Sequence, residues 1–157
     1  MLKNGAILRY HKNSPSFWFC ILALALDVVY FCVAYETKME ALPYVVGLQV
    51  SLDVVLNILF MLFAFLAAEK LKAYDLNWCY VSFGMAVIQV VRAFHIPFLS
   101  YANKAGQVKE FITGPTRYIS MILLILSGGA LVAGGIIGLI KTKILRKHLE
   151  EIGEGVH

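Results

Sequence analysis

The sequence predicts an all-α membrane protein, an antiparallel bundle of four transmembrane helices in a single membrane domain that covers residues 1–157. Hydrophobic residues make up 60% of the chain and charged residues only 15%, which is more apolar than is usual for a soluble domain. The apolar residues gather in four stretches, at about 17–35, 44–68, 78–96 and 118–140. About 20 apolar residues in a helix cross the roughly 30 Å hydrocarbon core of a bilayer, and each stretch approaches or exceeds that length.

Capping and helix-breaking residues flank the four stretches in chain order. Ser14-Pro15-Ser16 precedes the first stretch and Pro43 the second, where a proline fits the first helical turn. Asp75 or Asn77 can cap the third helix, and Pro97 should end it. Thr113-Gly114-Pro115 opens the fourth. Aromatic residues stand at the span ends, as they do at membrane interfaces: Trp18, Tyr35, Tyr44, Trp78 and Tyr118.

Two segments outside the spans have some apolar pattern of their own. The connection 98–114 mixes apolar and polar residues, which suits an interfacial helix or a cover over the outer mouth of the bundle. The tail 141–152 keeps helical spacing of Leu145, Leu149 and Ile152. We expect it to prolong the fourth helix into the cytoplasm.

The basic residues predict the orientation of the chain. If all four stretches cross, nine Lys and Arg lie on the side of the termini and four on the other side. The positive-inside rule then places both termini in the cytoplasm, as a multi-pass protein of the plasma (inner) membrane if the chain is bacterial. Basic residues beside spans are orientation and headgroup signals, so we expect the lipid bilayer and no nucleic acid as a partner.

Three charged residues lie inside the stretches: Asp27, Asp53 and Arg92. A charge at the bilayer centre costs about 2.5–3.5 kcal/mol on insertion scales, so such residues face the bundle interior and find partners. At about 1.5 Å per residue, Asp27 and Asp53 reach nearly one level in antiparallel helices. Helical side chains lean toward the amino terminus, which tilts Asp53 and Arg92 toward each other. The sequence therefore predicts an Asp53–Arg92 ion pair.

Uncharged polar residues share faces with these charges. Gln49, Asp53 and Asn57 recur every four residues, and Gln89 lies three residues before Arg92. The predicted intramembrane polar cluster is Asp27, Gln49, Asp53, Asn57, Gln89 and Arg92. Asp27 has no positive partner of its own. It can share Arg92, accept a hydrogen bond from Asn57 or Gln89, bind a cation, or meet a charge on another subunit. Both an architectural role and a transport or ligand role remain open for the cluster.

The fourth stretch is rich in small residues. Ala130, Gly134 and Gly138 follow one another at four-residue spacing, which lets two helix backbones approach closely. The pattern predicts a helix-packing face, toward a neighbour in this chain or toward another chain.

No catalytic, cofactor or metal signature accompanies the membrane stretches. The three cysteines, Cys20, Cys32 and Cys79, are not spaced as zinc, haem or redox motifs are. We therefore expect no cofactor, no metal and no enzyme activity. The leading hypothesis is a small integral subunit of a multi-component membrane complex, working in solute transport or ion coupling with another subunit or itself as partner. The alternative is a self-sufficient homo-oligomeric ion or small-solute transporter that uses Asp27 and Asp53. A membrane enzyme or anchor ranks third.

Overall fold

The structure, a computed structural model, describes residues 13–35, 44–102 and 108–151, and all four predicted apolar stretches are helical in it. Helix α2 covers Ser14–Tyr35, α3 Tyr44–Lys72, α4 Leu76–His95 and α5 Pro115–Glu151. Each helix starts at or before the predicted stretch. Helix α3 runs four residues past the predicted end at Ala68. The predicted helical tail is the continuous end of α5, and its last residue, Ile152, lies outside the described residues.

Three of these helices, α2, α3 and α5, are long and apolar enough to cross a membrane. Helix α4 has 20 residues, but Asn77, Gln89 and Arg92 lower its mean hydropathy. The third crossing therefore stays a prediction, and so does the orientation of the chain.

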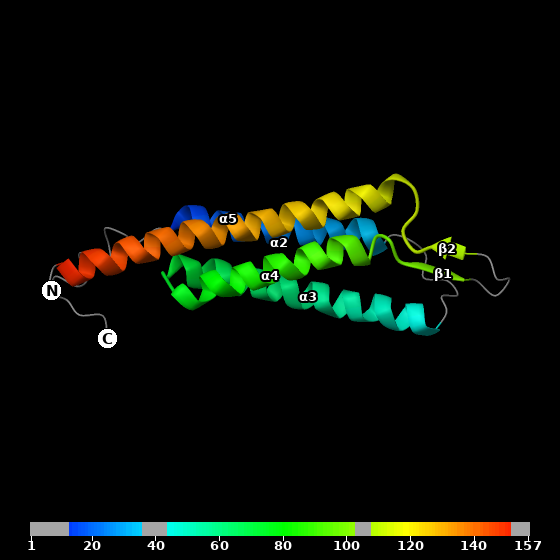
Figure 1. Cartoon of the computed structure of the whole chain (residues 1–157), viewed down its shortest axis with the longest axis horizontal. Coiled ribbons are helices and arrows are strands. Elements are labelled where there is room, and N and C mark those ends of the chain that lie inside the picture. The colour runs from blue at the N-terminus through cyan, green and yellow to red at the C-terminus, as the bar shows by residue number, and fades with distance from the viewer. Residues whose placement is uncertain (1–12, 36–43, 103–107, 152–157) are drawn as a thin grey trace.

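The helices form an up-down-up-down bundle in which each helix runs opposite to the one before it (Figure 1). Helix α5 packs extensively on both α2 and α4, and α3 packs on α2 and less closely on α4. Helices α3 and α5 touch only slightly, so they lie diagonally across the bundle. This order places one polar face of each helix toward the bundle axis.

Local sequence signals explain the ends of α4 and the start of α5. Asp75 is the N-cap of α4, and its side chain accepts a hydrogen bond from the backbone N–H of Asn77 at 3.0 Å. Helix α4 ends at His95, two residues before Pro97. Gly114 has φ +61°, a left-handed conformation that glycine adopts without strain, and Pro115 follows as the first residue of α5. The three predicted boundaries are confirmed.

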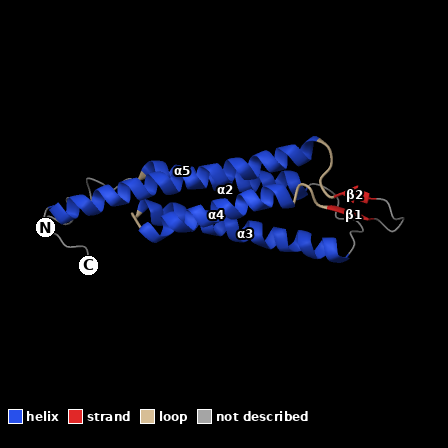
Figure 2. Ribbon diagram, in the orientation of Figure 1, coloured by secondary structure: helices blue, strands red, loops and turns tan. Residues whose placement is uncertain are grey.

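A two-stranded antiparallel hairpin follows α4, so the purely α-helical prediction needs a correction. Strand β1 (Ser100–Ala102) pairs with β2 (Val108–Glu110), with Ser100 opposite Glu110. The backbone N–H of Phe111 donates to the carbonyl of Leu99 at 2.9 Å and extends the pairing. Figure 2 shows the strands beyond one end of the helices. The described residues of the connection 98–114 form no interfacial helix, because Pro97 and Gly114 break the helix on either side and the two flanks pair instead. The connection instead covers this end of the bundle, the other predicted alternative, because Phe111 and Ile112 are buried against the helices.

Two apolar clusters fill the bundle, one toward each end. The cluster toward the hairpin includes Tyr30, Val50, Ala93 and Leu124, and the cluster toward the α3–α4 turn includes Ala23, Phe60, Ala86 and Leu131. On every helix a gap separates the residues of the first cluster from those of the second. Buried polar side chains occupy these gaps: Asp27, Asp53, Asn57, Gln89, Arg92 and Ser127. We call these six residues the polar layer.

Candidate functional site: a buried polar layer between two apolar clusters

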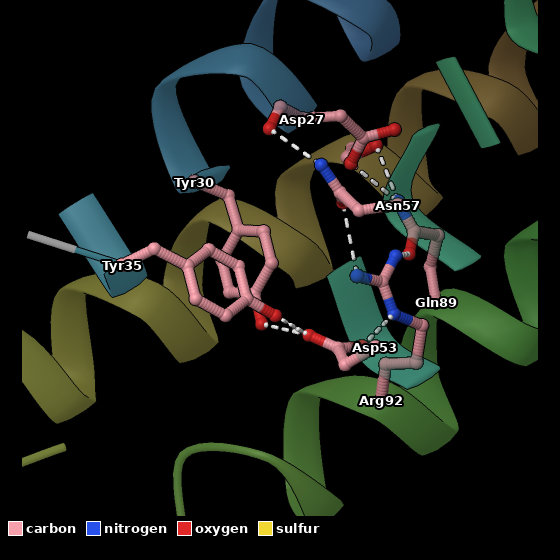
Figure 3. Close-up of polar contacts among 8 residues, drawn as sticks. Asp27, Tyr30, Tyr35, Asp53, Asn57, Gln89 and Arg92 are labelled. Atoms are coloured by element: carbon pink, nitrogen blue, oxygen red, sulfur yellow. Dashed lines mark hydrogen bonds and ion pairs between the residues drawn. The ribbon is translucent and has the colours of Figure 1, made fainter. Parts of the chain in front are cut away.

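Arg92 is the centre of the polar layer, and its guanidinium makes three hydrogen bonds. Nε donates to Asp53 Oδ1 at 2.9 Å, Nη1 to Gln89 Oε1 at 2.8 Å and Nη2 to Asn57 Oδ1 at 2.9 Å. Figure 3 shows the guanidinium reaching across from α4 to the two polar residues of α3. The predicted Asp53–Arg92 ion pair is confirmed, and only 2% of the Asp53 side chain and 5% of the Arg92 side chain are exposed.

Aromatic rings enclose the Arg92 guanidinium. Its Cζ lies 5.4 Å from the centre of the Tyr30 ring and 5.3 Å from that of Phe60. A cation over an aromatic face gains about 0.5–2 kcal/mol, most where water is excluded. The buried cation therefore has three polar acceptors and two ring faces, which together offset the loss of its hydration.

Two tyrosines of α2 occupy the second oxygen of Asp53. Oδ2 accepts a hydrogen bond from the Tyr30 hydroxyl at 3.0 Å and another from the Tyr35 hydroxyl. The sequence prediction missed both roles, because Tyr35 was assigned to the membrane interface and Tyr30 was given no polar role. A usable signal existed in Tyr30, since a tyrosine inside an apolar span needs a partner for its hydroxyl.

Asp27 is completely buried and only partly satisfied. Its Oδ1 accepts a hydrogen bond from Gln89 Nε2 at 2.5 Å, and its backbone oxygen accepts a weaker one from Asn57 Nδ2 at 3.4 Å. Oδ2 has no hydrogen-bond partner among the described residues. Of the predicted alternatives for the Asp27 carboxyl group, the hydrogen bond from Gln89 is the one that forms. Asn57 reaches only the Asp27 backbone, and Arg92 makes its ion pair with Asp53.

Ser127 connects the layer to α5. Its hydroxyl accepts a hydrogen bond from Gln89 Nε2 at 3.1 Å and donates to the carbonyl of Ala23 at 3.3 Å. The small-residue pattern of α5 predicted only helix packing and did not indicate the hydrogen-bonding role of Ser127. A continuous hydrogen-bond network thereby joins all four helices, from Tyr35 near the hairpin through the polar layer to Ser127.

Gln49 is the predicted cluster residue that the layer does not include. It is half-buried and makes no hydrogen bond to another described residue. The four-residue spacing places Gln49 on the same side of α3 as Asp53. Gln49 lies one turn closer to the hairpin, however, where Val46 and Val50 fill the core instead.

The small residues of α5 serve contacts within the chain. A Cβ on Gly134 would lie 3.2 Å from Cys20 Sγ and 3.3 Å from the carbonyl of Ser16, both on α2. A Cβ on Gly138 would lie 2.8 Å from Leu71 Cδ2. Ala130 is buried in the cluster toward the α3–α4 turn. This face therefore brings α5 close to its own neighbours, and it is not free for a second chain.

The polar layer contains two carboxylates and one guanidinium, so its formal charge is −1 when all three are ionised. No group of three or more His, Cys, Asp or Glu side chains in the described part of the chain could hold a metal ion. The layer therefore holds one carboxyl group more than its single cation can neutralise.

No family model matches this sequence, and neither a curated protein nor a solved structure matches the chain. Its function is therefore inferred from the geometry of the polar layer.

Proposed function

We propose that the chain is a small integral membrane subunit of a larger membrane complex, in which the Asp27 carboxyl group takes up and releases a proton and so couples ion movement to the work of the complex. The observation that carries this proposal is the surplus acid. Asp53 and Arg92 neutralise each other at 2.9 Å, whereas Asp27 is fully buried with one carboxyl oxygen unpartnered among the described residues.

A purely architectural layer does not need a second acid. Gln89 donates its amide N–H to Asp27 Oδ1, and the side-chain oxygen of an asparagine would accept that bond equally well. An ionised, unpaired carboxylate away from water is strongly unfavourable, whereas a bound proton removes its charge. Ionisable residues buried in membrane segments are rare and tend to mark proton or ion pathways.

The groups that face Asp27 come from all the neighbouring helices. Helix α4 presents Gln89 and, beyond it, the Arg92 cation, while α3 presents Asn57. Helix α5 presents the hydroxyl of Ser127. Asp53 is held by Arg92 and by the two tyrosines of α2. A proton on Asp27 therefore leaves one cation and one carboxylate in the layer.

The shape of the bundle supports a subunit over a self-sufficient transporter. From Asp27 toward the hairpin, polar contacts continue through Asp53 to Tyr35. In the opposite direction, the hydrogen bonds of the layer end at Ser127 and the carbonyl of Ala23. The described core beyond them is mostly apolar, and no hydrogen bond joins its buried polar side chains to the layer: Asn13, Ser16, Ser82 and Thr142. A proton that crosses the whole membrane needs a second path, and we assign that path to a partner subunit.

Four crossings with both termini in the cytoplasm belong to this proposal, as does a location in the plasma (inner) membrane of a bacterium. The sequence count supports it, with nine Lys and Arg in the segments on the side of the termini and four in the other two loops. So does the up-down-up-down order, which requires α4 to cross once α2, α3 and α5 do.

Replacing Asp27 with asparagine tests whether the Asp27 carboxyl group carries a proton. Infrared spectra of the purified chain should contain the carbonyl band of a protonated carboxyl group near neutral pH, and Asp27→Asn should remove it. Asp75→Asn, which changes an acid outside the layer, is the matched control and should leave the band unchanged. Wild-type protein without the band, or Asp27→Asn protein that keeps it, would contradict the proposal.

Native mass measurement of gently extracted protein tests whether the chain is a subunit of a larger complex. We expect the chain to migrate with other polypeptides, and Asp27→Asn should assemble normally but lose ion-coupled activity of the complex. A homo-oligomer that conducts ions alone in vesicles would establish the self-sufficient transporter instead. A lone monomer without flux would reject both functions.

A further inference from the structure

A basic pocket lies at the end of the bundle away from the hairpin, where α2 begins and α3 ends. The pocket has a volume of about 230 Å³ and is lined by Ser14, Phe17, Trp18 and Lys72. It combines one cation, one hydroxyl and two aromatic rings. This composition is different from that of the polar layer, and the pocket has no part in the function proposed above.

Lys72 is held in place by a ring and not by an acid. Its Nζ lies 5.1 Å from the centre of the Phe17 ring, and neither ion pair of the described residues uses it. A lysine ammonium carries three N–H donors. Against a ring face it keeps donors available for an anion on its open side.

The pocket lies at the helix ends, where lipid headgroups would lie if α2 and α3 cross a bilayer. Ser14 is the first residue of α2 and Lys72 the last of α3, and both helices are long and apolar enough to cross a membrane. Trp18 is 63% exposed, and half-exposed tryptophans are enriched at the headgroup level. Further basic residues at the same end, including Lys70 and Lys143, add to the positive potential.

We infer that this pocket binds the phosphate headgroup of an anionic phospholipid, with Lys72 and Ser14 as donors to the phosphate and with Phe17 and Trp18 against the upper part of an acyl chain. Basic pockets between membrane helices are suited to such headgroups. The charge favours an anionic lipid over a zwitterionic one, and the aromatic wall favours a lipid over free phosphate.

Lipid retention by the full chain tests this inference. The protein, extracted in neutral detergent, would receive phosphatidylglycerol or phosphatidylcholine with identical acyl chains, and native mass spectrometry would count the bound lipid. We expect wild-type protein to retain phosphatidylglycerol preferentially. Lys72→Gln should lower that affinity by about tenfold or more, the effect of losing a charge-assisted hydrogen bond.

Lys70→Gln is the matched control. It removes the same charge two residues before Lys72, and the Lys70 side chain does not line the pocket. General attraction of a surface lysine to anionic lipid predicts a loss of about fivefold at most for this variant. Equal losses for the two variants would overturn the pocket, as would wild-type protein that does not distinguish the two lipids. Inorganic phosphate that binds as tightly as the lipid would overturn the assignment to a membrane lipid. Circular dichroism without added lipid checks that both variants fold.

Discussion

The Asp53–Arg92 ion pair should be worth far more to this bundle than an ordinary contact between membrane helices. Asp53→Asn leaves the Arg92 guanidinium buried with only neutral acceptors, those of Gln89 and Asn57. Leaving one partner of a buried pair uncompensated costs about 3–5 kcal/mol. Arg92→Gln leaves two buried acids and should cost a similar amount. We therefore expect either single substitution to destabilise the bundle by about 3 kcal/mol or more.

The double variant Asp53→Asn/Arg92→Gln removes both charges and leaves two neutral polar groups. It should be less destabilised than the sum of the two single variants, with a coupling energy of about 2 kcal/mol or more. An ordinary hydrogen bond between membrane helices couples by only about 0.6 kcal/mol. The size of the coupling therefore distinguishes a buried ion pair from a replaceable polar contact.

Reversible unfolding in mixed micelles, followed by the fluorescence of Trp18 and Trp78, measures the four free energies of the cycle. The matched control is the cycle of Glu110 and Arg117, an ion pair whose acid is 47% exposed. That pair should couple by at most about 1 kcal/mol. If the Asp53–Arg92 coupling is no larger than the control, the claim that the layer depends on a buried charge pair is refuted.

Three further substitutions test the rest of the structure. Gly134→Ala places a Cβ 3.2 Å from Cys20 Sγ and should destabilise the bundle by about 1–3 kcal/mol in the same unfolding assay. Gly129→Ala, whose Cβ meets open space, should be neutral or slightly stabilising. Equal losses of stability in the two variants would contradict the close packing at Gly134. Tyr35→Phe removes one hydrogen bond to Asp53 and should lower the free energy of unfolding by about 0.5–1.5 kcal/mol. Tyr44→Phe, at an exposed position, should leave it unchanged. If Tyr35→Phe also leaves it unchanged, Tyr35 does not belong to the network. Phe111→Ala empties a buried site against Tyr35 and should speed hydrogen exchange at Val108–Glu110. Val108→Ala should not, because the Val108 side chain is 76% exposed. Protection from exchange that persists in Phe111→Ala would show that the hairpin does not depend on this contact.

The sequence determined the helices and much of the polar layer by itself, because both follow from short-range rules. Long apolar stretches, a capping aspartate at 75 and Pro97 and Gly114 as breakers set where helices begin and end. The four-residue spacing of Asp53 and Asn57 put them on one face, and the lean of helical side chains was enough to pair Asp53 with Arg92.

The other partners of the two acids could not be predicted from the sequence. They depend on the order of the helices around the bundle axis, which places Tyr30 and Tyr35 against Asp53, and Gln89 with Ser127 beside Asp27. The same order left Gln49 out of the layer and turned Gly134 and Gly138 of α5 toward neighbouring helices. Such contacts join residues far apart in the chain, and their distances are set by how four helices pack together, which no local pattern encodes.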